Sequence, residues 1–94
     1  MEFTYQEKIS MMRILLDIVH ADGIIDAREI FFFNQLKEVL DVAEEDYNII
    51  KEKNSLLALV QIRRMDDEKK LYFSKLMNKM IIIDEDVNVN EFAI

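Results

Sequence analysis

Cysteine and proline are absent from this chain of 94 residues, and Gly23 is its single glycine. The lack of cysteine excludes disulfide bonds, thiolate metal ligands and thiol nucleophiles, and it agrees with a reducing compartment, so we expect a cytoplasmic location. Because proline and glycine are the residues that most often interrupt helices, and leucine, methionine, glutamate and lysine are abundant, we expect long uninterrupted helical segments. The composition therefore predicts an all-α protein.

Long hydrophobic runs and positive charge are also scarce. Apolar runs such as Met80 to Ile83 are far shorter than the roughly 20 residues of a membrane-spanning helix, so we expect no direct membrane insertion. The N-terminus has no basic segment ahead of an apolar one, so no signal peptide is expected. Twelve basic residues against 19 acidic ones give a net charge of −7, which repels phosphate backbones. Nucleic acid is therefore not an expected partner.

The length of the chain suits one domain over residues 1–94, with enough apolar residues, 51%, for a core. No serine has a recognisable His and acid partner, and phosphate-binding glycine loops are missing, so we expect no enzyme. Apolar residues at helical spacing predict a compact bundle of about five helices. These predicted helices cover approximately residues 5–20, 27–40, 43–52, 56–62 and 66–84.

The ends of these helices are marked by polar residues. Thr4 with Glu7, and Asp26 with Glu29, have the spacing of a capping box, which marks the start of a helix. Ser55 is the expected cap of the fourth helix. The last helix should end near Asp84, because the residues that follow are polar and β-branched.

Two helices carry more apolar residues than one face can hold. Leu56, Leu57, Leu59 and Val60 cover much of the fourth helix, which predicts burial on several sides. The last helix is expected to bury Leu71, Phe73, Leu76, Met77 and Met80. Phe31, Phe32 and Phe33 point about 100° apart on the second helix, so either Phe31 or Phe32 contacts another chain or a loop, or the helix is sandwiched inside the domain.

A weak internal repeat relates the two acidic segments of the chain. A shift of 62 positions places Asp22 on Asp84 and Glu29 on Glu91, and the apolar residues before them also align. We therefore expect two pseudo-repeated helix-turn-helix units. Because Glu91 stands close to the last residue, the second unit is either shortened or completed by a partner.

The first acidic segment fits the second half of a calcium-binding loop when Gly23 takes the sixth position. Asp22, Asp26 and Glu29 then take the fifth, ninth and twelfth positions, but Ile18 and His20 cannot supply the carboxylates of the first half. Two such turns packed together would bring several carboxylates close to one another, and oxygen ligands favour Ca²⁺ or Mg²⁺. The candidate metal ligands are Asp22, Asp26, Glu29, Asp84, Asp86 and Glu91.

A purely structural interpretation explains most of the same residues. Gly23 would supply the positive φ that ends the first helix, and Asp26 and Glu29 would cap the second. His20 is then a histidine at the end of a helix, next to the carbonyl dipole, and not a ligand. This interpretation does not explain why Asp22 recurs at Asp84, so both remain open.

The segment LLDIVHADGIIDAREIFFF and the later segment IIDEDVNVNE resemble TerB-like domains, the helical family named after a bacterial tellurite-resistance protein and similar to the N-terminal domain of a membrane-anchored co-chaperone. The most specific match is the turn formed by Ala21, Asp22, Gly23, Ile25 and Glu29. The resemblance implies an all-α domain with two repeated units and acidic residues that bind a divalent cation, in a bacterial stress response. Glu85 departs from the family pattern, where glycine is usual.

Two hypotheses of function follow. The first is a non-enzymatic module that binds a divalent cation, Ca²⁺ or Mg²⁺, through the two acidic turns. The second is a protein-interaction domain with an unknown partner or a second copy of itself, whose acidic turns only cap helices and whose exposed apolar surface includes Phe31 or Phe32.

Overall fold

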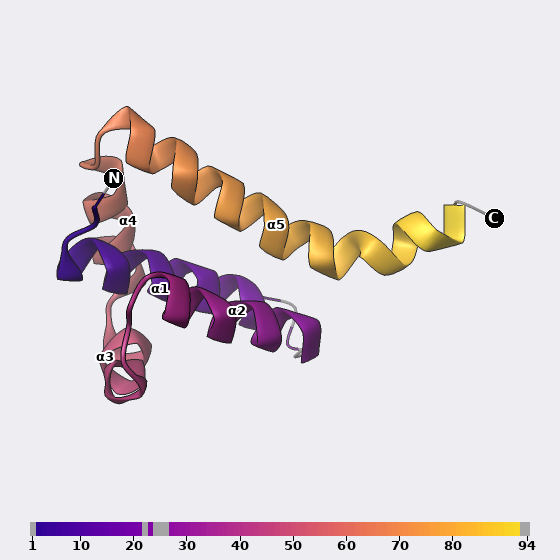
Figure 1. Ribbon diagram of the computed structural model, residues 1–94, viewed down its shortest axis with the longest axis horizontal. Coiled ribbons are helices and arrows are strands. Elements are labelled where there is room, and N and C mark those ends of the chain that lie inside the picture. The colour runs from indigo at the N-terminus through magenta and orange to yellow at the C-terminus, as the bar shows by residue number, and fades with distance from the viewer. Residues whose placement is uncertain (1, 22, 24–26, 93–94) are drawn as a thin grey trace.

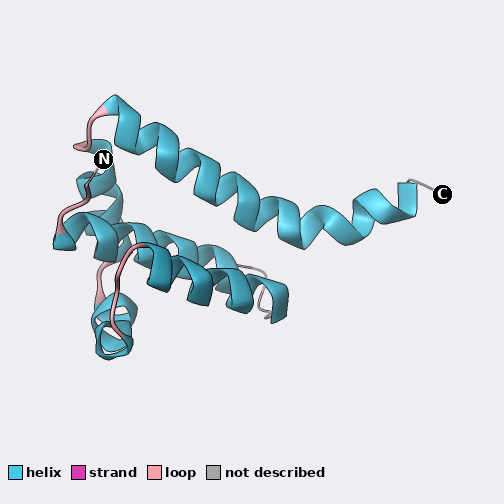
Figure 2. Cartoon of the chain, in the orientation of Figure 1, coloured by secondary structure: helices cyan, strands magenta, loops and turns pink. Residues whose placement is uncertain are grey.

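The computed structural model describes residues 2–21, 23 and 27–92, with side chains up to residue 81. The described residues form helices and no strands, as the composition predicts (Figure 2). Figure 1 shows how these helices are arranged. The elements are α1 (Tyr5–His20), α2 (Ala27–Val39), the 3₁₀ helix η1 (Glu44–Asp46), α3 (Tyr47–Glu52), α4 (Ser55–Arg63) and α5 (Asp67–Phe92).

The N-terminus of α1 has the predicted capping box. The Thr4 hydroxyl accepts a hydrogen bond from the Glu7 amide at 3.1 Å, and the Glu7 carboxylate accepts one from the Thr4 amide at 2.8 Å. Both amides, which have no hydrogen-bond partner within the helix, thus have an acceptor. The start of α1 is therefore determined by residues three positions apart in the sequence.

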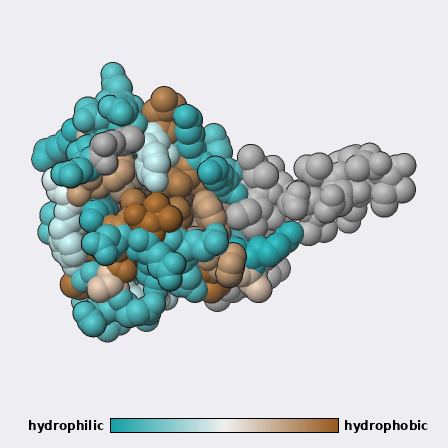
Figure 3. Space-filling model, viewed as in Figure 1, coloured by the Kyte–Doolittle hydropathy of each residue, from teal (hydrophilic) through white to brown (hydrophobic). Residues whose placement is uncertain are grey.

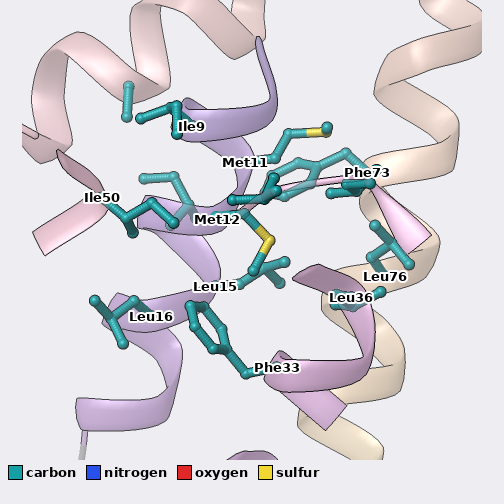
Figure 4. Packing of buried hydrophobic residues seen from close by; sticks show 14 of the residues in the cluster. Ile9, Met11, Met12, Leu15, Leu16, Phe33, Leu36, Ile50, Phe73 and Leu76 are labelled. Carbon is teal, nitrogen blue, oxygen red and sulfur yellow. The ribbon is translucent and has the colours of Figure 1, made fainter. Parts of the chain in front are cut away.

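Helix α1 forms the centre of the core. Figure 4 shows Met12 and Leu15 of this helix between Ile50 on one side and Phe73 on the other. All four side chains are fully or almost fully buried. Because α1 contacts α2, α3, α4 and α5, it buries residues around much of its circumference and not along one stripe.

Left-handed backbone conformations end the first two helices. Gly23 has φ of 74°, and its amide donates to the His20 carbonyl at 3.2 Å, so the predicted helix terminator is confirmed. At the end of α2, Asp41 has φ of 57°. The Val42 amide there donates to the Lys37 carbonyl at 2.8 Å and the Asp41 amide to the Glu38 carbonyl at 3.1 Å, which is a Schellman motif.

Helix α4 differs from its prediction in two ways. Its cap is Asn54 and not Ser55, because the Asn54 side chain accepts from the amides of Leu56 and Leu57. The prediction that α4 is buried on several sides is also wrong. Only Ala58 and Ile62 are buried along it, because α4 packs on α1 with one face.

Helix α5 begins close to its predicted position but continues through Phe92, well past Asp84. The segment that contains Asp84, Asp86 and Glu91 is therefore helical in its backbone, and the second acidic turn of the expected repeat is not formed. A helix of 26 residues extends about 39 Å, which agrees with the 44 Å long axis of the molecule. Figure 1 shows the end of α5 extending past the other helices.

The inner face of α5 is mostly as predicted. Phe73, Leu76 and Met80 are buried, and Met77 packs partly against the core. Leu71 is an exception, because it is exposed. Among the described residues, no helix is both long and apolar enough to span a membrane.

The three consecutive phenylalanines of α2 have three environments. Phe33 is buried, Phe32 packs partly against the core and Phe31 is 66% exposed. Helix α2 is therefore not sandwiched inside the domain, and Phe31 lies on the surface of the chain.

Candidate functional site

Helix α4 is held firmly on α1 by its inner face. The buried side chains of Ala58 and Ile62 belong to the common core, and the buried Ser10 hydroxyl of α1 hydrogen-bonds to the side-chain oxygen of Gln61. Because the Ser10 hydroxyl is fully buried, it requires a hydrogen-bond partner, and this contact therefore specifies how the two helices are aligned.

A second polar cluster holds the start of α4. Asp17 of α1 accepts from the Ser55 hydroxyl at 2.7 Å and forms an ion pair with Arg13 at 2.9 Å. The Arg13 guanidinium also donates to Ser55 at 3.1 Å and to the Lys51 carbonyl at 2.5 Å, in the last turn of α3. Since Arg13 thus contacts α1, α3 and α4 at once, the cluster joins three elements.

The outer face of α4 is apolar and exposed, although the helix itself is firmly held. Leu56 is 72% exposed and Leu57 60%, and Leu59 and Val60 are also more than two-fifths exposed. Four large apolar side chains within one short helix form a continuous patch, in contrast to scattered surface leucines, which are common on soluble proteins. We call these four residues the α4 patch.

Two arginines border the α4 patch. Arg63 and Arg64 are exposed at the end of the helix and, together with Val60, line a shallow depression of about 280 Å³. Neither guanidinium pairs with a carboxylate within the part of the chain that is described. The patch therefore combines an apolar surface with positive charge, in a chain whose net charge is −7.

Other hydrophobic residues also reach the surface. In the view of Figure 3, hydrophobic residues are visible in the middle of the face between hydrophilic ones. Phe31 and Leu71 lie on other helices, and Phe32, the second residue of the expected interface, is only partly exposed. The α4 patch differs from them because its members are neighbours on one element.

The predicted metal ligands are only partly covered by the structure. Glu29 is 3% exposed in the first turn of α2. Asp22 and Asp26 lie outside the described residues, and so do the side chains of the three later ligands, Asp84, Asp86 and Glu91. In the described part of the chain, no three His, Cys, Asp or Glu side chains come together as a metal site would require. The cation site stays a prediction.

The histidine prediction concerns a described residue. His20 is exposed in the last turn of α1, as expected for a residue at a helix end. Met11, Met12, Met65 and Met80 are buried in the core as packing residues.

Sequence reasoning missed two features. It interpreted the apolar residues of α4 as core, although the two arginines that follow them are a signal of a surface helix. It also missed a pocket around Lys37, a buried residue of α2 that pairs with Glu44. Lys37 follows Phe33 and Leu36 at helical spacing on the inner face, and a lysine at such a position is the signal that could have revealed it.

Comparisons with known proteins do not add to this picture: no family model matches the chain, and no curated protein or solved structure is significantly similar to it. The resemblance to TerB-like domains therefore stays a prediction.

Proposed function

We propose that this chain is a small non-enzymatic module that associates with a second copy of itself through the α4 patch. The single observation that carries the proposal is the exposure of four large apolar side chains on one firmly held helix: Leu56, Leu57, Leu59 and Val60. Full burial of a leucine side chain is worth roughly 1.5 to 3 kcal/mol, so this surface favours association. It is also preorganised, because the polar clusters on the inner face keep α4 in place.

Charge favours a second copy in which the two α4 helices run antiparallel. Two-fold symmetry then places the apolar residues of one helix against those of the other, with Leu56 facing Val60. The arginines of the two copies lie at opposite ends of the pair, so they do not repel. Each Arg64 then lies near the start of the partner helix, where Glu52 is exposed at the end of α3. The lysines on either side of Glu52 have other partners, since the Lys51 ammonium lies over the Tyr47 ring and the Lys53 ammonium donates to Gln6.

The surface area that two α4 helices can bury determines how strong a dimer we expect. A pair of nine-residue helices buries less than the roughly 1,200 Å² of a standard stable interface, so we expect a weak and reversible dimer. A dissociation constant in the range of about 10 μM to 1 mM is typical of such a contact.

The test is sedimentation equilibrium of the whole chain over that concentration range, with Leu57→Glu and Leu71→Glu as matched variants. Leu57 is 60% exposed on α4 and Leu71 is 58% exposed on α5, so both substitutions bury no charge and change the net charge equally. We expect Leu57→Glu to abolish the dimer and Leu71→Glu to leave it unchanged. A wild-type chain that stays monomeric at 1 mM, or equal loss in both variants, would contradict the proposal.

Charge reversal tests the orientation of the pair. Arg64→Glu and Glu52→Arg alone should each weaken the dimer, because each places like charges together. The two changes in the same chain should restore it, since each Arg then meets a Glu across the two-fold axis. A double variant as weak as the two single variants would exclude the antiparallel arrangement.

The alternative from the sequence is a divalent-cation module in a bacterial stress response, and it stays a prediction. Calorimetric titration of Ca²⁺ and Mg²⁺ into the wild type and into an Asp22→Ala, Glu29→Ala double variant would decide it. Heat released by the wild type alone would support a cation site, whereas silence in both proteins would remove that alternative.

A further inference from the structure

A pocket of about 400 Å³ lies between α1, α2, η1 and α3, and none of its lining residues belongs to the α4 patch. Leu16, Ile30 and Phe33 form its apolar wall. Phe33 meets the ring of Tyr47 edge to face, with 6.4 Å between ring centroids, which keeps the aromatic side of the pocket in place. Its volume is within the range of pockets that hold small organic ligands.

Lys37 brings a positive charge into this pocket. Its side chain is only 8% exposed, and its ammonium lies 5.5 Å from the centre of the Tyr47 ring. The ammonium of Lys51 lies 5.7 Å from the same ring. Only two charged side chains line the pocket among the described residues, the buried Lys37 and the exposed Glu44; the other carboxylates of η1, Glu45 and Asp46, do not line it. The buried ammonium is therefore the fixed charge of the pocket, and a negatively charged group is the complementary ligand.

The partner of Lys37 is a side chain that a ligand can replace. Glu44 Oε1 lies 3.3 Å from the Lys37 ammonium, but the Glu44 side chain is 90% exposed. An exposed, solvated carboxylate contributes little to an ion pair, since holding it in place costs entropy and water screens the charge. A ligand whose apolar part is bound in the pocket would place its carboxylate against the same ammonium. That carboxylate would then be held in place without the entropic cost of ordering a free side chain.

We propose that this pocket binds a small organic carboxylate. The carboxylate pairs with the Lys37 ammonium in place of Glu44, and the apolar part of the ligand contacts Leu16, Ile30 and Phe33. The side-chain amides of Asn34 and Asn48 also line the pocket and are available to orient the ligand. The juxtaposition of an apolar wall, a buried cation and a displaceable surface carboxylate defines the ligand class.

Three probes test this ligand class: 3-phenylpropionate, its neutral amide and acetate. Each is titrated into the whole chain, and binding is followed by NMR through the backbone amide signals. We expect saturable shifts of pocket signals, including those of Asn34 and Asn48, with 3-phenylpropionate. Binding of the amide and of acetate should be at least about tenfold weaker, because one lacks the charge and the other the apolar part. Equal binding of the acid and the amide, or no saturable shift with the acid, would overturn the proposal.

Variants then assign the binding to the pocket. Lys37→Met keeps the apolar stem and should weaken 3-phenylpropionate binding at least about tenfold. Glu44→Gln should strengthen it about two- to fivefold, since the competing carboxylate is gone. Lys75→Met, at an exposed lysine of α5, is the matched control and should change nothing. If Lys37→Met loses its helical circular dichroism, Glu44→Gln decides alone, and unchanged or weaker binding in that variant would overturn the proposal.

Discussion

Gly23 and Asp41 show at the scale of single residues how one backbone conformation is tolerated at different cost. Both have positive φ at the end of a helix. Glycine adopts this conformation freely, whereas it costs other residues roughly 1 to 2 kcal/mol. The cost is smaller for aspartate than for most other residues. Asp41 also places a negative charge at the C-terminus of α2, where the helix dipole disfavours it.

Asp41→Gly should therefore stabilise the chain by up to about 1 kcal/mol, because it relieves both effects. Gly23→Ala should destabilise it by about 1 kcal/mol. A methyl group at Gly23 meets no atom of the described residues within 4 Å, and the expected cost comes from the left-handed backbone conformation. Urea unfolding measures both changes, and a loss of stability in Asp41→Gly would show that the aspartate side chain has a favourable role.

Glu7 combines a cap with an ion pair. Its carboxylate lies 2.9 Å from the Lys69 ammonium at the start of α5. Burial raises the pKa of Glu7, but hydrogen bonds from the Thr4 backbone and from Lys69 outweigh that effect, and the net pKa lies below its usual value of 4.5. The ionised carboxylate is thus favoured in the folded chain.

This shift predicts how stability depends on pH. Because the pKa of Glu7 is lower in the folded chain than in the unfolded chain, its contribution is fully present above about pH 4.5 and is lost as the pH falls through the folded value. Glu7→Gln keeps a side chain that fits the capping box but removes the charge. Urea unfolding should show the variant about 0.5 to 1 kcal/mol less stable than the wild type at pH 7, and the gap should be smaller at pH 3, below the usual pKa of 4.5. A gap that is the same at both pH values would refute the role of the charge.

At the scale of elements, α4 shows how neighbouring polar residues divide their roles. Sequence spacing alone could not distinguish Ser55 from Asn54 as its cap, because both are good capping residues. The structure assigns the cap to Asn54, since Ser55 is already bonded to Arg13 and Asp17 of α1. A contact distant in sequence thus decided a local feature.

Asn54→Ala should destabilise the chain by about 1 kcal/mol, because the amides of Leu56 and Leu57 lose their acceptor. Asn54→Asp supplies an equally good acceptor and should retain the stability. Thermal unfolding of the three proteins, followed by circular dichroism, makes the comparison. Equal loss in both variants would indicate that the Asn54 side chain acts through some other contact.

For the whole molecule, one central helix organises the core. Helix α1 was predicted with its correct bounds, and its many contacts explain why it is apolar beyond a single stripe. The α4 patch and the pocket at Lys37 share no residue, so variants of one leave the side chains of the other unchanged and the two proposed activities can be tested separately. The net charge of −7 opposes self-association at long range, and the two arginines beside the patch offset it locally.

Local chemistry determined what the sequence alone could predict about this chain: an all-α fold, the capping box of Thr4 and Glu7, the left-handed turn at Gly23 and most of the inner face of α5. These features depend on residues a few positions apart, whose propensities and hydrogen bonds act within one element. Only the tertiary structure decided that α4 exposes its leucines, that α5 continues through residues 84–91 and that Lys37 lies in a pocket. Burial depends on which elements pack together, and an apolar helix has the same sequence whether its partner is the core of its own chain or another molecule.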